Sequence, residues 1–100
     1  MIDLRPFPEG GVSTAEPIGA YAWIGNENPF MSTWDAKASG DVANWAQVVV
    51  VGPMATPEQY LQAVRARSAG SWRIVTVEEM QVHGIEPKNG FQSIVLRKAN

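Results

Sequence analysis

The sequence predicts an α+β fold: a single small domain in which a mixed sheet of about four to five strands has one main crossover helix packed on one face. Three observations predict it. Residues 48–51 are consecutive valines, residues 57–69 follow a helical pattern after a strong start signal, and residues 72–77 return to strand-forming side chains. A strand, a helix and a strand joined this closely predict a parallel pair with a right-handed crossover.

The folded domain is expected to span residues 18–100. Residues 1–17 contain three prolines and the pair Gly10-Gly11 without a periodic apolar pattern, so we expect an irregular N-terminal lead-in there. With 100 residues, the chain has the size of one domain that buries roughly two thirds of its unfolded surface.

Residues 18–24 are expected to form the first strand, because Tyr21 and Trp23 share one face and smaller side chains occupy the other. Residues 25–29 are dense in turn-forming residues and should reverse the chain. Residues 30–34 are then expected to pair back as a short second strand.

Residues 47–51 are expected to form a strand in the centre of the sheet. The run has no polar alternation, which is typical of a strand buried on both faces. Just before it, Asp41 is placed to cap a single helical turn through residue 45.

The helix over residues 57–69 has the clearest boundaries. Thr56 suits the N-cap, Pro57 the first helical position, and Gln59 the third position of a capping box. Gly70 suits the left-handed position that ends a helix.

The C-terminal third contains one ambiguous segment. Thr76 followed by Glu79 favours a short helix within residues 76–84, whereas the apolar residues of that segment also fit a continued strand, and both alternatives stay open. Residues 91–98 are expected to form the final strand, after a turn that contains Asn-Gly.

Composition excludes several classes of protein. The absence of cysteine excludes disulfides and thiolate sites. The N-terminus lacks the basic and apolar regions of a signal peptide, and the longest apolar run is about six residues, whereas a membrane helix needs about 20. We therefore expect a cytoplasmic protein with no membrane partner.

Charge is distributed unevenly along the chain. Residues 1–56 hold two basic and six acidic side chains, whereas residues 57–100 hold six basic and four acidic ones. Neither half has the basic stripe of a nucleic-acid binder, so no nucleic-acid partner is expected. The acidic half suits either a basic partner or an ordinary solvated surface.

Motifs for catalysis, metals or cofactors are not found. Residues 52–56 lie where a phosphate loop would lie, but they contain one glycine, a proline and no lysine. His83 is the single histidine, and with Glu79 it makes at most a two-ligand set, too few for zinc. No serine lies in a nucleophile motif. We expect no metal, no cofactor and no enzymatic activity.

Aromatic residues concentrate in the first half of the chain. Five of the nine lie between residues 21 and 45, interleaved with acidic side chains. Such residues form either core beneath the first hairpin or a binding surface, because tryptophan and tyrosine are enriched at binding hot spots. For the second alternative, the candidate contact residues are Tyr21, Trp23, Glu27, Asn28, Trp34 and Asp35.

The expected function is therefore the binding of another protein through this aromatic and acidic surface. A small non-enzymatic chain of this kind fits an inhibitor or adaptor, a type common in phages and mobile elements. Two alternatives stay open. One is an anion- or nucleotide-binding domain or enzyme that uses the helix N-terminus after residues 48–51. The other is a structural subunit of a homo-oligomer.

Overall fold

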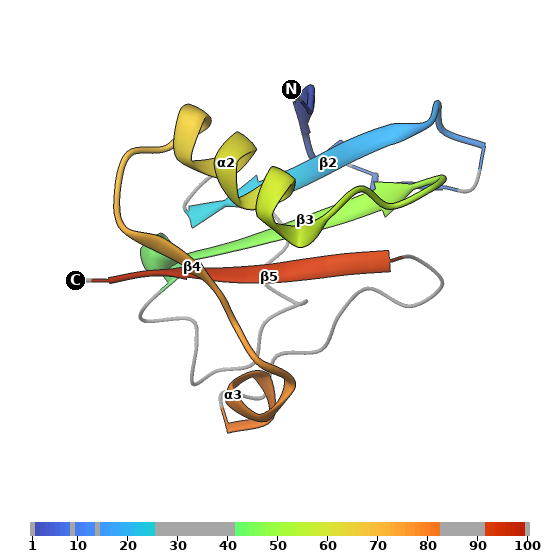
Figure 1. The fold of residues 1–100 in the computed structure, drawn as a ribbon. Helices are drawn as coiled ribbons and strands as arrows, with labels where there is room; N and C mark the ends of the chain where they lie inside the picture. Colours follow the sequence, from blue (N-terminus) through green and yellow to red (C-terminus); the bar gives the residue numbers. More distant parts are fainter. Residues whose placement is uncertain (1, 9, 14, 26–41, 83–91, 100) are drawn as a thin grey trace.

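A computed structural model describes residues 2–8, 10–13, 15–25, 42–82 and 92–99, which form a mixed sheet with helices (Figure 1). The predicted α+β class is confirmed. The elements follow in the order β1 (Leu4–Pro6), β2 (Gly19–Ile24), the 3-10 turn η3 (Val42–Asn44), β3 (Trp45–Val51), α2 (Pro57–Arg67), β4 (Trp72–Ile74), α3 (Val77–Val82) and β5 (Gln92–Lys98). The strand expected over residues 30–34 lies outside the described residues.

The sheet has five strands in the order β1-β2-β3-β5-β4. β1 and β2 are parallel, and the other three pairs are antiparallel. β3 is the central strand, as its unbroken apolar run predicts, and its residues from Trp45 to Val50 are all buried. Burial on both faces therefore fixes β3 in the middle of the sheet.

The expected pairing of β3 with β4 is wrong in one respect. β5 lies between them and is antiparallel to both, so β3 and β4 are parallel to each other but are not neighbours. The connection through α2 is thus a split strand–helix–strand unit. The local sequence predicts the strand–helix–strand crossover. It does not predict that β5, from the C-terminal end of the chain, is inserted between β3 and β4.

β1 adds a strand inside the segment that was expected to be an irregular lead-in. Leu4 pairs with Ala20 and Pro6 with Ala22 in the parallel register. Pro6 lies at the end of an edge strand, where its missing N–H interrupts no ladder between two strands. Three residues ending in a proline carry no alternation, which is why the sequence does not predict this strand.

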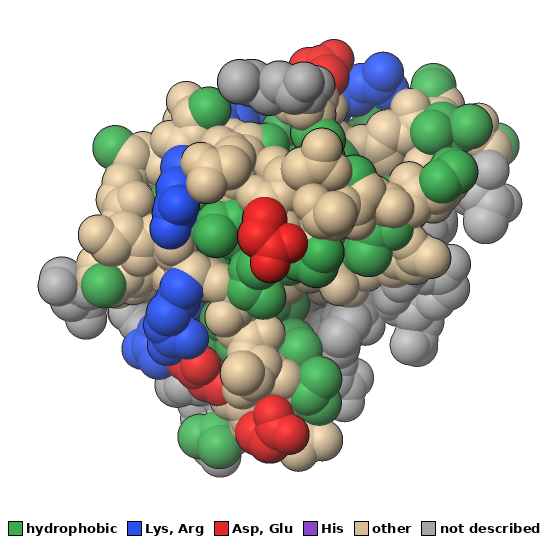
Figure 2. All heavy atoms as spheres, in the orientation of Figure 1, with side chains coloured by type: hydrophobic (Ala, Val, Ile, Leu, Met, Phe, Trp, Pro, Cys, Tyr) green, Lys and Arg blue, Asp and Glu red, His purple; other side chains and the backbone are tan. Residues whose placement is uncertain are grey.

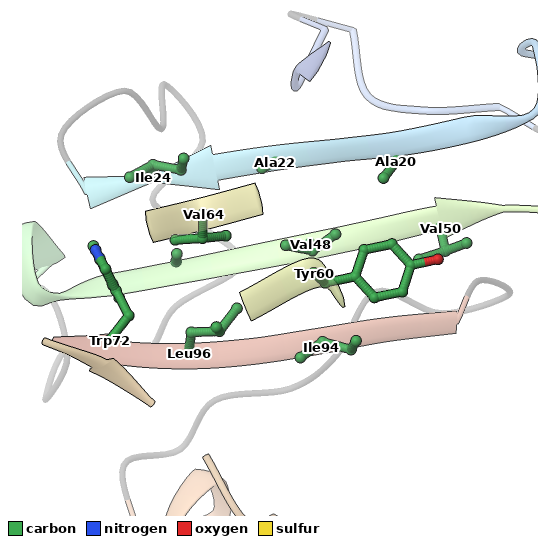
Figure 3. Packing of buried hydrophobic residues seen from close by; sticks show 11 residues of the cluster. Ala20, Ala22, Ile24, Val48, Val50, Tyr60, Val64, Trp72, Ile94 and Leu96 are labelled. Atoms are coloured by element: carbon green, nitrogen blue, oxygen red, sulfur yellow. The ribbon is translucent and has the colours of Figure 1, made fainter. Parts of the chain in front are cut away.

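The main core lies between the sheet and α2. Ala46, Val48 and Val50 of β3 face the helix, together with buried side chains of β2 and β5. Tyr60 and Val64 of α2 pack in the same cluster (Figure 3). The alternate residues of the same strands therefore form one apolar layer.

α2 begins at Pro57 as predicted and ends at Arg67, two residues earlier than expected. Ser68 takes an extended backbone (φ −136°, ψ 118°), which ends the helix. The indole Nε1 of Trp72 donates to the Ser68 carbonyl over 2.9 Å. The first residue of β4 thus satisfies a carbonyl at the helix end that would otherwise lack a partner.

The other face of the sheet carries two smaller clusters. Phe7 and Val12 pack on Tyr21, Trp23 and Val49. The second cluster is centred on Trp45 and packs against Met80 of α3. α2 lies across the sheet, whereas α3 lies apart from it near the β4–β5 edge (Figure 1). Among the described residues, no helix is long and apolar enough to cross a membrane.

The described part of the ambiguous segment forms a helix, α3 (Val77–Val82), whose N-terminus is capped by Thr76. The Glu79 backbone N–H donates to Thr76 Oγ1 over 3.2 Å. None of the six α3 residues is buried, so packing contributes little to its position. A short helix of this kind needs another attachment.

An ion pair supplies that attachment. Arg73 of β4 donates from Nη1 and Nη2 to the two Glu79 carboxylate oxygens, over 2.7 and 2.6 Å. Arg97 lies 3.6 Å from the same carboxylate and stacks over the Trp45 ring at 4.9 Å. Hydrogen bonding from Arg73, with attraction from Arg97, holds the pKa of Glu79 below its ordinary value. The charged form of Glu79 therefore stabilises the folded state.

Replacing Glu79 by glutamine should lower the free energy of unfolding by about 0.2–1 kcal/mol at neutral pH, because the pair is partly exposed. A lowered pKa gives stability that is present above the ordinary glutamate range and lost as the pH falls below about 4.3. Urea unfolding of both proteins from pH 7 to pH 3 measures this. The difference between them should shrink at the acid end.

Glu78→Gln is the matched control, because Glu78 is exposed on the same helix. A pH-independent deficit in Glu79→Gln, or an equal one in Glu78→Gln, would show that the Arg73 pair does not stabilise the fold.

Gln47 is a buried polar residue in the central strand. It is 1% exposed, and it lies between Trp23 of β2 and Val95 of β5 in the register. Within the described structure, its Nε2 has no hydrogen-bond partner, and neither does Oγ of Ser93 on the same face. An unpaired buried donor costs about 1–3 kcal/mol.

Gln47→Met should therefore leave the fold intact and raise the free energy of unfolding by up to about 1 kcal/mol, since it removes an unpaired donor at similar volume. Gln47→Glu should destabilise strongly, because it buries a charge. Chemical denaturation of the two variants tests both. Destabilisation of Gln47→Met by more than about 1 kcal/mol would mean that the amide has a necessary partner.

Candidate functional site

Two of the six candidate contact residues, Tyr21 and Trp23, belong to β2 and lie on its face away from α2. The other four, Glu27, Asn28, Trp34 and Asp35, lie outside the described residues, as does His83. The structure therefore brings together only the first two, and they do not lie on the surface.

Trp23 is a core residue. It is 1% exposed, and its ring stacks on Phe7 with centroids 3.8 Å apart and an interplanar angle of 25°. Of the two alternatives that the sequence leaves open for the aromatic residues, the core applies to this one. The large ring of Trp23 packs on Phe7 and so holds the N-terminal segment against the sheet.

Tyr21 is also buried, at 4% exposure, but its hydroxyl makes hydrogen bonds to two residues near the surface. The hydroxyl accepts a hydrogen bond from Arg5 Nη1 over 3.1 Å and donates one to the Pro17 carbonyl over 3.0 Å. The Arg5 guanidinium lies over the Tyr21 ring, 5.6 Å from its centroid. Tyr21 thus holds an arginine in place at the edge of the sheet.

Arg5 borders a candidate site, a pocket of about 260 Å³ at one end of the sheet. We call it the sheet-end pocket. Its lining residues come from the start of β2, the end of β3 and the loop that leads to α2. These parts of the chain meet at one end of the sheet in Figure 1. Its apolar lining includes Ile2, Ile18, Val50, Val51, Pro53 and Ala55.

Polar groups at the pocket are few. Asp3 is exposed and Arg5 is half-buried, so the lining contains one anion and one cation. Tyr60 closes the inner side, and its hydroxyl accepts a hydrogen bond from the Ala55 backbone N–H over 2.9 Å. The pocket is therefore an apolar hollow with charges of both signs.

Exposed apolar residues border this hollow. Ile18 is 72% exposed, and Met54, between two lining residues of the β3–α2 loop, is 36% exposed. Figure 2 shows hydrophobic side chains at the surface on this end of the molecule, at the upper right. Together they extend the apolar surface beyond the pocket itself.

Gly52 allows the loop to pass close to Ile18. Its φ is +97°, and a Cβ at this position would lie 2.8 Å from Ile18 Cγ2. A side chain there would strain the backbone and displace Ile18. The single glycine of the loop thus permits the close approach of two segments.

Three backbone N–H groups at the N-terminus of α2, those of Ala55, Thr56 and Gln59, have partners within the chain. The Thr56 N–H donates to Gln59 Oε1 over 3.1 Å, as the predicted capping box requires, and the Gln59 N–H donates to the Thr56 carbonyl over 3.0 Å. The Ala55 N–H is taken by Tyr60, and Pro57 has none. These groups are therefore not available to an anion, and the first turn also carries Glu58.

A second hollow of about 210 Å³ lies between β1 and α2, and Ile2 lines both. It is formed by Ile2, Leu4, Ala63, Ala66 and Arg67. Small side chains on α2 leave this space open beside the edge strand. The apolar surface thus continues from the sheet-end pocket along the β1 side of the molecule.

No protein-family model, curated protein or solved structure matches the chain. Function is therefore inferred from the pocket and the surface around it. Sequence reasoning missed the two residues that matter most there, Arg5 and Ile18. Neither belongs to a motif, because the pocket forms only when β1 pairs with β2, an arrangement that leaves no local pattern.

Tyr21→Phe should keep the fold and lower the free energy of unfolding by about 0.5–1.5 kcal/mol, because it removes the hydroxyl but keeps the buried ring. Trp23→Ala should cost about 3–5 kcal/mol, since it empties the space against Phe7. Thermal and urea unfolding of the two variants measure both effects. A Trp23→Ala protein as stable as the parent chain would contradict its place in the core.

Proposed function

We propose that this protein is a non-enzymatic binding domain that docks another protein at the sheet-end pocket. The observation that carries the proposal is Ile18, a large apolar side chain that is 72% exposed at the border of an open apolar hollow. A side chain of this kind loses free energy by leaving water, and a partner surface is what would cover it.

The size of the pocket favours a protein partner over a small molecule. Sites for drug-sized ligands usually measure about 300–1,000 Å³ and bury most of the ligand. The sheet-end pocket measures about 260 Å³ and is open, so it suits one inserted side chain. The exposed Ile18 and Met54 then supply contact area around that insertion.

The chemistry at the pocket also favours binding without catalysis. Its ionisable lining residues are Asp3, Arg5 and Tyr60, which do not form a nucleophile with an adjacent base. An arginine surrounded by apolar surface is instead typical of protein interfaces. A domain that binds in this way would act as an inhibitor or an adaptor.

This surface differs from the one that the aromatic residues suggest. Tyr21 and Trp23 would act indirectly: Tyr21 would hold Arg5 in place, and Trp23 would hold the N-terminal segment in place. The partner would touch Ile18, Met54 and the pocket.

Ile18→Asp tests the proposal. The side chain is exposed, so the fold should survive, whereas a charge at the centre of a docking surface should weaken binding at least about tenfold. Tagged protein would be used to capture partners from a lysate of its native host, and bound proteins would be quantified by mass spectrometry. A specific partner should be captured by the parent chain and lost with Ile18→Asp.

Val82→Asp is the matched control, because Val82 is 69% exposed on α3. It should retain the partner. Loss with Val82→Asp and retention with Ile18→Asp would move the docking surface to α3 and overturn the proposal. Light scattering of the purified chain would separate a foreign partner from self-association, since a homo-oligomer forms without lysate.

A further inference from the structure

Arg5 is held in one place by groups on its own side of the sheet. The Tyr21 hydroxyl accepts from Nη1 over 3.1 Å, and the Tyr21 ring lies beneath the guanidinium. A Cβ on Gly19 would lie in ordinary van der Waals contact with the guanidinium carbon, 3.5 Å away, so the arginine lies close against β2. A cation fixed in this way loses little conformational entropy when it binds a ligand.

The guanidinium keeps most of its hydrogen-bonding capacity. It carries five N–H donors, and the hydrogen bond to Tyr21 uses one of them. Among the described residues, no carboxylate forms an ion pair with Arg5, although Asp3 lines the same pocket. Arg73 differs, because Glu79 occupies its fork with two hydrogen bonds.

Arg5 lines the apolar hollow, and its guanidinium lies at the same end of the sheet, on the face that carries Gly19 and Tyr21. A cation and an apolar hollow at one end of the sheet together define a ligand chemistry. A carboxylate is the group whose two oxygens match the arginine fork. The adjoining volume of about 260 Å³ is lined largely by Ile, Val, Pro and Ala side chains, which favours an apolar group. One ligand would satisfy both if its carboxylate lay a few bonds from a large apolar group.

We propose that the sheet-end pocket recognises a partner segment in which a large apolar side chain lies next to a carboxylate, with the apolar group in the pocket and the carboxylate on Arg5. The inference rests on the proposed docking function and names the chemistry of its partner. An acidic residue beside a Leu, Met or Phe in the partner segment has this chemistry.

The negative charge of Asp3 should have the opposite effect on carboxylate binding to the positive charge of Arg5. Its carboxylate is exposed at the same pocket and repels an incoming anion, an effect that salt screens beyond about 10 Å. Removing the positive charge of Arg5 and removing the negative charge of Asp3 should therefore change carboxylate binding in opposite directions.

The experiment uses 3-phenylpropionate and its neutral analogue 3-phenylpropanamide, followed by methyl chemical-shift changes of the full chain in NMR. The two probes share the apolar group and differ in charge. The acid should bind at least about fivefold more tightly than the amide, with Ile18 and Val50 among the perturbed methyls. The advantage should decrease as salt is added.

Three variants then test which residues cause the preference for the acid over the amide. Arg5→Gln should abolish the preference for the acid, and Asp3→Asn should increase it about twofold. Tyr21→Phe should reduce the preference in part, because the guanidinium remains but is less fixed. Amide binding should stay unchanged in all three, which shows that the apolar pocket has kept its shape.

Equal binding of the two probes, or an unchanged preference in Arg5→Gln, would overturn carboxylate recognition. Absence of binding by both probes would overturn it as well, and the Ile18→Asp capture experiment would still decide the docking function. If the acid binds as expected and Ile18→Asp still captures the partner, the pocket recognises carboxylates but docking takes place elsewhere.

Discussion

The burial of β3 on both faces is the constraint on which the rest of the structure depends. Its even-numbered residues face α2 and its odd-numbered residues face the smaller clusters, so each face of the strand requires a separate cover. α2 supplies the first cover. On the second face, Phe7 and Val12 pack on the cluster of Tyr21 and Trp23, and Met80 packs on the cluster of Trp45. Because backbone groups of a buried strand need partners on both edges, β2 and β5 must also flank it.

Sequence patterns predict the individual helices and strands better than they predict which strands pair with each other. Thr56 and Pro57 give the start of α2, and the valine run gives the position of β3, because capping and burial are local properties. The insertion of β5 between β3 and β4, and the pairing of Leu4 with Ala20, depend on contacts far apart in the chain, which no local pattern records.

The same limit explains the candidate site. The sequence points to Tyr21 and Trp23 because large aromatics are conspicuous, and the structure uses both as internal supports. Arg5 and Ile18 become a site only when β1 lies beside β2 and the loop after β3 passes Gly52. A candidate surface built from short segments of three elements carries no spacing that can be read in advance.

The sheet-end pocket is complete only while β1 is paired with β2. This three-residue strand supplies Arg5, and with its neighbours Ile2 and Asp3 it forms one wall. Short edge strands are among the first parts of a protein to open by local unfolding. Each opening of β1 removes the wall, so ligand affinity and the folding of the first few residues are thermodynamically coupled. A bound partner would then slow amide exchange of the β1 residues by more than that of the central strands.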